Sequence, residues 1–189
     1  MQNRIDTKLK EARDEGRTIL APFVTIGFPT IQMSSEVITS VLEAGSDMLE
    51  LGIAFSDPLA DGPTIQKTSF AALKNGVTVH TALEVVRKLR EQGTKAPFIY
   101  MGYYNPFLRY GTTAFARDAI PAGADGVIVP DLPTEEAGPF KSVCESHGLY
   151  LIPLLAPTST DTRIKQACLN AKGFIYCVSL MGVTGARRG

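Results

Sequence analysis

Three carboxylates lie close together in the segment ELGIAFSDPLADGP, which spans residues 50–63. Glu50 lies near the end of the apolar run DMLELG, and Asp57 and Asp61 follow in a loop that two prolines stiffen. Two carboxyl groups held apart can donate and accept protons at two places on one substrate. Aspartates in loops also stabilise turns, and this role explains Asp57 equally well. The segment is therefore the first candidate for acid–base chemistry.

The strand that carries Glu50 determines where its side chain points. In an extended segment over 47–51, alternation puts Met48 and Glu50 on one face and Leu49 and Leu51 on the other. In a closed βα barrel, Glu50 would project inward at the carboxyl ends of the strands, where barrel enzymes place their chemistry. A surface glutamate at a strand end is the alternative, which the flanking leucines disfavour. Apolar walls around an inward carboxyl group would raise its pKa toward neutrality.

Six glycines divide the chain into similar units. Each follows a polar, helix-like segment and precedes an apolar, strand-like run, as expected of a glycine just past a helix end. Such runs alternating with helices predict βα units on a parallel sheet. The longest interval separates the second and third runs and contains the acidic loop, so we expect an elaboration there. The units begin at Gly16 before RTILAPFVTIG, Gly45 before SDMLELG, Gly93 before TKAPFIYMG, Gly123 before ADGVIVP, Gly148 before LYLIPLLAP and Gly173 before FIYCVSL.

The length of the repeat agrees with a βα barrel, but it does not distinguish a barrel from an open sheet. A closed eightfold βα barrel usually takes about 250 residues, and this chain of 189 residues provides six strand-like runs. We expect one α/β domain over residues 1–189, a (β/α)8 TIM barrel that covers the first six βα units and is truncated after strand six. An open doubly wound sheet is the alternative on periodicity alone. No GxGxxG follows the first run, which weakens the dinucleotide-binding version of that sheet.

Charge and composition exclude several classes of function. Lysine plus arginine equals aspartate plus glutamate at 19 each, so no basic excess favours nucleic acid or an anionic membrane surface. The first ten residues, MQNRIDTKLK, are polar, and no run has the length and apolarity of a membrane helix. We therefore expect a cytoplasmic protein. Three cysteines without CxxC spacing and two separated histidines predict no metal site.

Motifs along the whole chain resemble the tryptophan synthase alpha chain family. The segment LELGIAFSDPLADG, residues 49–62, is similar to the family's signature, and this acidic motif is highly specific. Further similarities follow in the family's order, which makes a chance resemblance untenable. They are LAPFVTIGFP (20–29), YMGYYNP (100–106), GVIVPDLP (126–133), LLAPTST (154–160) and SLMGVTG (179–185).

The resemblance implies a lyase of tryptophan biosynthesis. Members of the family cleave indole-3-glycerol phosphate by a retro-aldol reaction into indole and glyceraldehyde 3-phosphate. They use neither a metal nor a Schiff base in this step, so no cofactor is expected in this chain. Indole passes to a beta-chain partner, which holds pyridoxal phosphate, in an alpha2-beta2 heterotetramer.

The resemblance also gives the two acids separate tasks. The bond between the side chain and the indole ring breaks only after the ring carbon that carries it has been protonated. Glu50 matches the residue that protonates the ring and takes a proton from the side-chain hydroxyl. Asp61 matches the carboxylate that accepts the indole N–H and stabilises positive charge on the ring.

Other residues are similar to the family's site by their position in the motifs. Each also has an ordinary explanation, because apolar residues and tyrosines pack cores and Thr184 lies in a glycine-rich turn. The residues expected to bind substrate are Phe23, Met101, Tyr103, Ile128, Tyr176 and Thr184. Those expected at or near the beta-chain interface are Asp57, Asn105 and Asp131.

Two features depart from the family pattern. Ala54 stands where the family usually has proline, which predicts a looser start of the acidic loop. The family builds its phosphate site from loops after strands seven and eight. We expect those two units to be missing here, and therefore weak or no activity for residues 1–189 alone.

Three other functions are compatible with parts of the pattern. A shortened, non-catalytic alpha-like subunit could bind and modulate the beta chain. An alpha-like lyase could release free indole without a beta chain. A metal-dependent aldolase is disfavoured, because the sequence has no histidine cluster to hold the metal.

Overall fold

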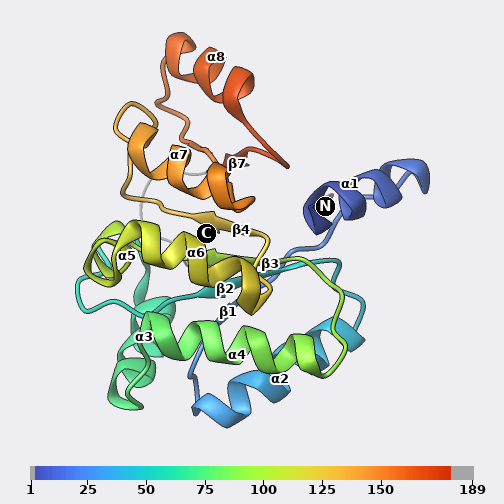
Figure 1. Ribbon diagram of the computed structural model, residues 1–189, viewed down its shortest axis with the longest axis vertical. Coiled ribbons are helices and arrows are strands. Elements are labelled where there is room, and N and C mark those ends of the chain that lie inside the picture. Colours follow the sequence, from blue (N-terminus) through green and yellow to red (C-terminus); the bar gives the residue numbers. More distant parts are fainter. Residues whose placement is uncertain (1–2, 180–189) are drawn as a thin grey trace, which may run out of the picture.

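The computed structural model describes residues 3–179, and its centre is a parallel sheet (Figure 1). The strands lie in chain order and every neighbouring pair is parallel, as the alternation of helices and strands predicts. The sheet consists of β1 (Phe23–Thr25), β2 (Leu49–Gly52), β3 (Phe98–Met101), β4 (Gly126–Ile128) and β5 (Tyr150–Leu151). A second parallel pair is formed by β6 (Leu154–Leu155) and β7 (Tyr176–Cys177).

The fifth apolar run, LYLIPLLAP, forms two short strands where the sequence predicts one. Pro153 lies between β5 and β6, and its nitrogen has no hydrogen to donate to a neighbouring strand. Ile152 N still donates to Val127 O at 2.9 Å, and Tyr176 N donates to Pro153 O at 2.9 Å. The run therefore joins β4 on one side to β7 on the other, and the predicted sequential order of strands holds.

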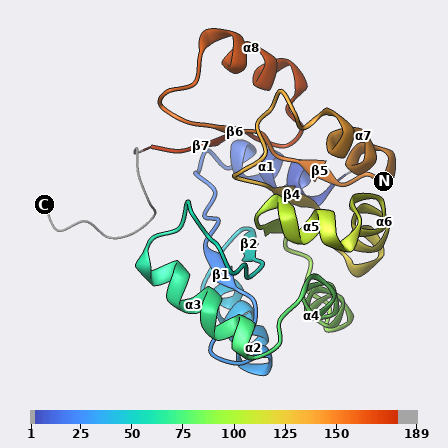
Figure 2. The ribbon, with the colours of Figure 1, turned by 90° about the vertical axis from the view of Figure 1, so that its left-hand side faces the viewer.

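Helices cover one side of the strands in an arc (Figure 2). Thr30, Thr78 and Thr160 begin three of them by accepting a backbone N–H with their side chains. The six glycines that divide the sequence all have positive φ, as predicted for residues just past helix ends. The helices are α1 (Arg4–Asp14), α2 (Ile31–Glu43), α3 (Pro63–Lys74), α4 (Val79–Glu91), α5 (Tyr104–Tyr110), α6 (Thr112–Ala122), α7 (Gly138–His147) and α8 (Asp161–Asn170).

The long interval between β2 and β3 contains the acidic loop and two helices, α3 and α4. This is the elaboration that the spacing of the glycines predicts. Helix α4 packs against the strands with one apolar side, on which Val79, Ala82, Leu83, Val86 and Leu89 are buried. The acidic loop thus connects β2 to α3, and residues of α4 line a cleft together with it.

The two faces of the sheet belong to different apolar clusters. On one face Met48, Ile99, Ile128 and Ile152 pack together with Tyr176, and we refer to this group as the interior cluster. On the other face the strand residues pack against the helices in a larger cluster that includes Leu49, Leu51, Phe98, Tyr100 and Val127. The alternation predicted for residues 47–51 is therefore confirmed, because Met48 and the two leucines lie on opposite faces.

Helix α1 stands apart from the other helices, at one end of the strands (Figure 1). Its Ile5 is fully buried in the interior cluster. Two glycines make room for this side chain, because a Cβ at Gly126 would lie 3.2 Å from Ile5 Cδ1 and a Cβ at Gly173 would lie 2.9 Å from Ile5 Cγ2. Helix α1 therefore closes the interior at the amino ends of the strands.

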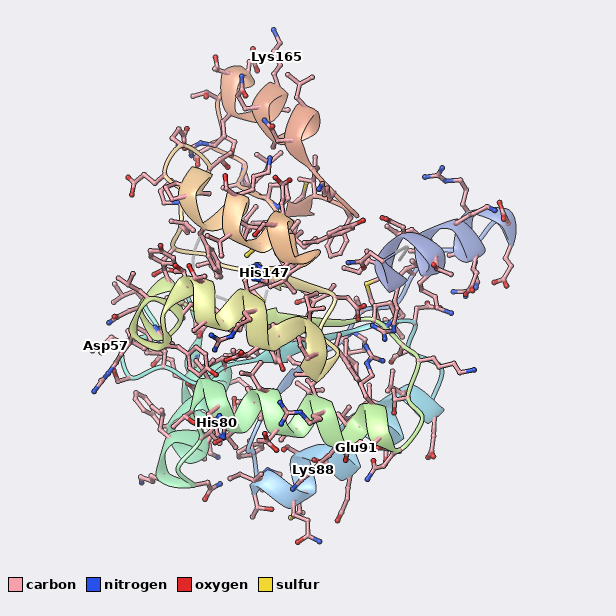
Figure 3. All side chains as sticks on the ribbon, in the orientation of Figure 1. Asp57, His80, Lys88, Glu91, His147 and Lys165 are labelled. Atoms are coloured by element: carbon pink, nitrogen blue, oxygen red, sulfur yellow. The ribbon has the colours of Figure 1, made fainter. Side chains whose placement is uncertain are left out.

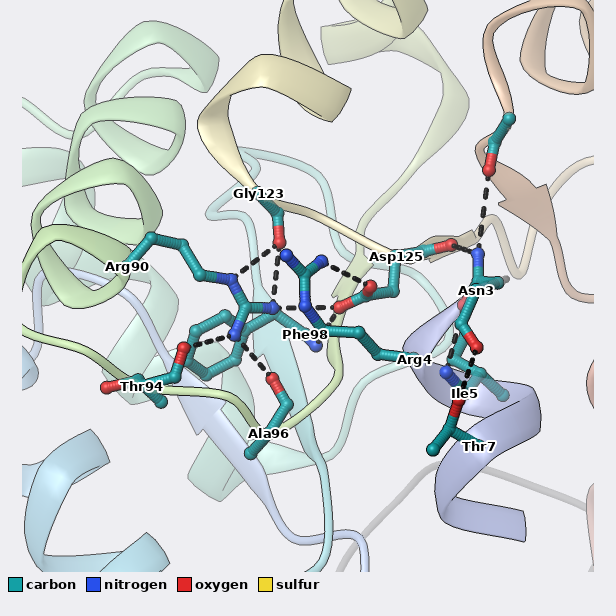
Figure 4. A network of polar contacts seen from close by, with 11 residues as sticks. Asn3, Arg4, Ile5, Thr7, Arg90, Thr94, Ala96, Phe98, Gly123 and Asp125 are labelled. Atoms are coloured by element: carbon teal, nitrogen blue, oxygen red, sulfur yellow. Dashed lines mark hydrogen bonds and ion pairs between the residues drawn. The ribbon is translucent and has the colours of Figure 1, made fainter. Parts of the chain in front are cut away.

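A buried aspartate connects four elements near the start of the strands (Figure 4). Asp125 accepts the Phe98 N–H at 2.8 Å and contacts Arg90 and Arg4, each at 2.9 Å. The Arg90 guanidinium also donates to the carbonyls of Gly123, Thr94 and Ala96 and lies 4.3 Å from the centre of the Phe98 ring. This network joins α1, α4, β3 and the approach to β4.

Candidate active site

Glu50 lies on the middle of β2, between two neighbouring strands. Its register partners are Phe23 on β1 and Ile99 on β3, so its side chain points to the same face as the interior cluster. Glu50 is 7% exposed, and burial raises the pKa of its carboxyl group from 4.5 to about 7. A carboxyl group with this pKa can both give and take a proton near neutral pH.

Tyr176 on β7 lies near Glu50 on the interior side. Burial raises the pKa of Tyr176, and the negative charge of Glu50 raises it further. A charge acts in this way only over a short distance. Strands β2 and β7 thus bring Glu50 and Tyr176 to the same interior space.

Asp61 lies in the loop after β2 and is held by backbone and side-chain contacts. The neighbouring Ala60 N–H donates to the Tyr103 hydroxyl at 2.8 Å, and Gln66 Nε2 donates to Asp61 O at 2.8 Å. Burial raises the pKa of the Asp61 carboxyl group, and a hydrogen bond from Tyr103 lowers it by a smaller amount. Tyr103 therefore contacts both the backbone and the carboxylate of this part of the loop.

Asp61 shares a small cavity with three of the residues expected to bind substrate, Phe23, Met101 and Tyr103. The cavity has a volume of about 30 Å³, which is room for water but not for a bicyclic aromatic ring. A substrate of that size must displace part of the lining. The acidic loop contributes Ala54 and Asp61 to this lining, and neither residue belongs to a strand.

Gly52 is a functional position that the sequence analysis missed. A Cβ at residue 52 would lie 2.3 Å from Cζ of Phe23, far inside the contact distance of two carbon atoms. The Phe23 ring can thus lie over β2 only because residue 52 has no side chain. A glycine at the end of an apolar strand was the available signal.

The other predicted substrate residues lie around the same interior. Ile128 is fully buried in the interior cluster, and Met101 packs against that cluster from β3. Tyr103 precedes α5, and its ring packs at a tilt against Phe55 with centroids 5.3 Å apart. Thr184, the remaining predicted residue, lies outside the described residues.

The residues expected at the partner interface lie close to one another at the carboxyl ends of the strands. Asp57 and Asn105 line a cleft of about 620 Å³ between the acidic loop, α4 and α5. Asp131 accepts the Tyr104 N–H at 2.8 Å, which places it beside Asn105. Asp57 lies at the edge of the molecule away from α1 (Figure 3).

Two leucines beside these residues are exposed to solvent. Leu59 in the acidic loop is 88% exposed, and Leu108 on α5 is 56% exposed. Ala54, where the sequence departs from the family pattern, is buried and lines both the cleft and the small cavity. The acidic loop therefore has one side toward the interior and another toward the exposed surface.

Residues 3–179 contain neither a candidate metal site nor a membrane-spanning helix. No group of three or more histidine, cysteine, aspartate or glutamate side chains is arranged to hold a metal ion in this range. Nor is any helix of that range both long enough and apolar enough to cross a membrane.

Comparison with known proteins identifies the family. A sequence model described as "Tryptophan synthase alpha chain" matches residues 9–189. The chain belongs to the tryptophan synthase alpha chain family. Its relatives include the "Tryptophan synthase alpha chain" of Roseiflexus sp. (strain RS-1), which is 50% identical over 186 residues, 98% of this chain and 71% of the relative. The protein of the same name from Clostridium acetobutylicum is 43% identical over 187 residues, 99% of this chain and 70% of the relative.

Solved structures of alpha chains match the fold. Tryptophan synthase subunit alpha from Legionella pneumophila str. Paris has a TM-score of 0.92 at 40% identity, over 95% of this chain and 68% of the other. A structure of Mycobacterium tuberculosis tryptophan synthase has a TM-score of 0.92 at 39% identity, over 100% of this chain and 72% of the other. These alpha chains are TIM barrels, so the predicted fold class is confirmed and the arc of strands in residues 3–179 is part of such a barrel.

Proposed function

We propose that this chain is the lyase that cleaves indole-3-glycerol phosphate into indole and glyceraldehyde 3-phosphate in tryptophan biosynthesis. Membership of the alpha chain family and the identity of about half of all residues with named alpha chains support this activity. The alternative of a non-catalytic subunit has no observation in its favour.

The observation that carries the proposal is the environment of Glu50. A carboxyl group buried on the interior face of β2, with a pKa of about 7, is suited to proton transfer in both directions. In the proposed reaction Glu50 first protonates the ring carbon that bears the glycerol phosphate side chain. It then takes the proton of the side-chain hydroxyl, and the carbon–carbon bond opens to give an aldehyde and indole.

Asp61 has the second role in the proposed reaction. Its carboxylate accepts the indole N–H and stabilises the positive charge that protonation puts on the ring. Phe23 and Met101 share the small cavity with Asp61 and are proposed to contact the flat faces of the ring, with Tyr103 beside them. Ile128 belongs to the interior cluster, and the partly buried Tyr176 packs against it.

The proposal includes a partner and excludes a resident cofactor. A beta chain is the partner of this family, and we propose an alpha2-beta2 heterotetramer in the cytoplasm, with pyridoxal phosphate held by the beta chain alone. Asp57, Asn105 and Asp131 are proposed to lie at that interface because they gather beside the acidic loop. The general acid–base chemistry described above needs no metal from this chain.

The proposal is tested by Glu50→Gln and Asp61→Asn in the full chain. The amide of Glu50→Gln cannot transfer a proton, so we expect indole release from indole-3-glycerol phosphate to fall by roughly a hundredfold to ten-thousandfold. Asp61→Asn should be severely impaired as well, because an amide neither balances a ring cation nor takes the indole proton. The readout is indole measured by chromatography in single-turnover reactions.

Glu36→Gln is the matched control, because Glu36 is an exposed glutamate on α2 and the change should leave the rate unaltered. Turnover of Glu50→Gln within a few-fold of the unchanged chain would remove Glu50 from the mechanism. An unchanged chain that releases no indole, yet alters the rate of the beta chain, would establish the non-catalytic alternative.

A further inference from the structure

Ser69 is a buried polar residue that the proposed mechanism does not use. It lies on α3, is 4% exposed, and its hydroxyl faces the acidic loop instead of its own helix. Ser69 Oγ accepts the Phe55 N–H at 3.0 Å and lies 3.2 Å from Phe55 O, to which it donates. One hydroxyl therefore satisfies both backbone groups of a residue at the start of the loop.

Phe55, whose backbone Ser69 holds, contacts Tyr103 through its ring. The two rings contact each other in a tilted arrangement, with centroids 5.3 Å apart and an angle of 32° between their planes. The Tyr103 hydroxyl in turn accepts the Ala60 N–H at 2.8 Å, directly before Asp61. A continuous series of contacts thus runs from Ser69 through Phe55 and Tyr103 to the residue that precedes Asp61.

The loop has other contacts as well, since Ile53 N donates to Met101 O at 2.8 Å and Ala54 and Pro58 are buried. Asp57 and Leu59 are exposed, and the Ser56 hydroxyl contacts only the adjacent Asp57 carboxylate, at 2.5 Å. Gln66 supports the loop at its far end. At Phe55 itself, Ser69 is the side chain that holds the backbone of the loop.

We propose that Ser69 is a positioning residue for the lyase reaction, which fixes the acidic loop so that the Asp61 carboxylate meets the indole nitrogen. The inference rests on the proposed role of Asp61. Ser69 lines the small cavity beside Asp61, but its hydroxyl is engaged by the Phe55 backbone, so we expect it to act through the loop. Its effect on the rate arises because displacement of a catalytic group by about 1 Å can cost roughly a hundredfold in rate.

The test combines Ser69→Ala with Asp61→Asn in the full chain. We expect Ser69→Ala to lower kcat for indole release by roughly tenfold to a hundredfold. In the Asp61→Asn background the same change should have little further effect, because groups that act as one unit are non-additive. A purely structural role of Ser69 would lower the rate by the same factor in both backgrounds, and that result would overturn the proposal.

Two further variants sharpen the experiment. Ser34→Ala is the matched control: Ser34 is a fully buried helix serine, but its hydroxyl donates to Ile31 O in its own helix at 2.8 Å, so kcat should stay unchanged. Ser69→Thr keeps the hydroxyl and should keep the rate within a few-fold of the unchanged chain. An equal loss of rate in Ser69→Thr and Ser69→Ala would contradict a role for the hydroxyl.

The outcome separates the two proposals. Nearly full activity of Asp61→Asn alone would refute the proposed role of Asp61 and with it this inference. Severe impairment of Asp61→Asn together with an unaffected kcat in Ser69→Ala would refute the inference only.

Discussion

A carboxyl group buried among apolar side chains favours its neutral form, and at Glu50 this affects the whole protein. The folded-state pKa of about 7 is above the unfolded value, so ionisation of Glu50 is easier in the unfolded chain. Below the unfolded pKa of 4.5 the burial has no such cost. As pH rises from there to about 7 the folded state loses stability, and above that pH the loss is constant at about 3 kcal/mol.

Glu50→Gln is therefore expected to stabilise the protein at high pH while it abolishes activity. The amide has the same shape and no charge to bury, so the variant should gain on the order of 3 kcal/mol in unfolding free energy at pH 8 and almost nothing at pH 4.5. Urea unfolding of both proteins across this range provides the measurement. A difference that does not change with pH would mean that Glu50 is not buried in the ionised state.

The same pKa predicts how the rate depends on pH. Glu50 must be protonated to donate to the ring, so kcat/KM for cleavage should fall as pH rises through about 7. Asp61 must be ionised, and burial raises its pKa, so activity should also fall at acidic pH, beginning above the usual range of an aspartate. Initial rates of indole formation over pH 5 to 9 test both limbs, and a rate independent of pH near 7 would contradict the assignment of Glu50.

Residues differ in how far the sequence predicted their roles. The inward direction of Glu50 follows from a two-residue period within one strand, which is a local property. Asp61 needed the family resemblance, because loop aspartates commonly only stabilise turns. Ser69 gave no signal, since its contact with Phe55 is fixed by how α3 packs back onto the loop. Such a contact depends on tertiary structure and not on residue type.

At the scale of elements, Asp125 is the connection whose loss should be most costly. Asp125→Ala would leave the Arg90 guanidinium buried without its carboxylate and the Phe98 N–H without an acceptor. Removal of one partner of a buried ion pair typically costs about 3 to 5 kcal/mol. Thermal or urea unfolding would measure the loss.

Glu84→Ala is the control for this change. The ion pair of Glu84 with Arg87 is on the surface of α4, where both side chains are substantially exposed. Such pairs contribute at most about 1 kcal/mol. Equal destabilisation by the two changes would mean that the Asp125 network adds nothing beyond a surface ion pair.

Elements were predicted well where the signal was periodic. The apolar runs predicted the strands in the correct order, and the long interval after β2 indicated an elaboration, which the structure shows to include an extra helix. The division of the fifth run was missed, although Pro153 was visible in it. Proline removes one hydrogen bond in the ladder, and whether a strand continues past it depends on the neighbours on each side.

At the scale of the whole molecule, the exposed side of the acidic loop is the expected contact with the beta chain. Leu59→Asp puts a charge at an apolar residue that is 88% exposed, so the melting temperature should stay unchanged while association with the beta chain weakens at least tenfold. Titration of the beta chain by calorimetry measures this. Leu169→Asp is the control, because Leu169 on α8 is 79% exposed and lies away from the loop. Equal weakening by both changes would argue against this interface.

Ile5 of α1 packs into the interior at the amino ends of the strands. Ile5 fills the space between Gly126 and Gly173, so no small molecule can pass between these residues. We therefore expect substrate and products to pass at the carboxyl ends of the strands, beside the acidic loop. A protein that covers these strand ends would affect both the entry of substrate and the release of products. A partner bound there would take up indole where it is released, and it would also control when the next substrate molecule can bind.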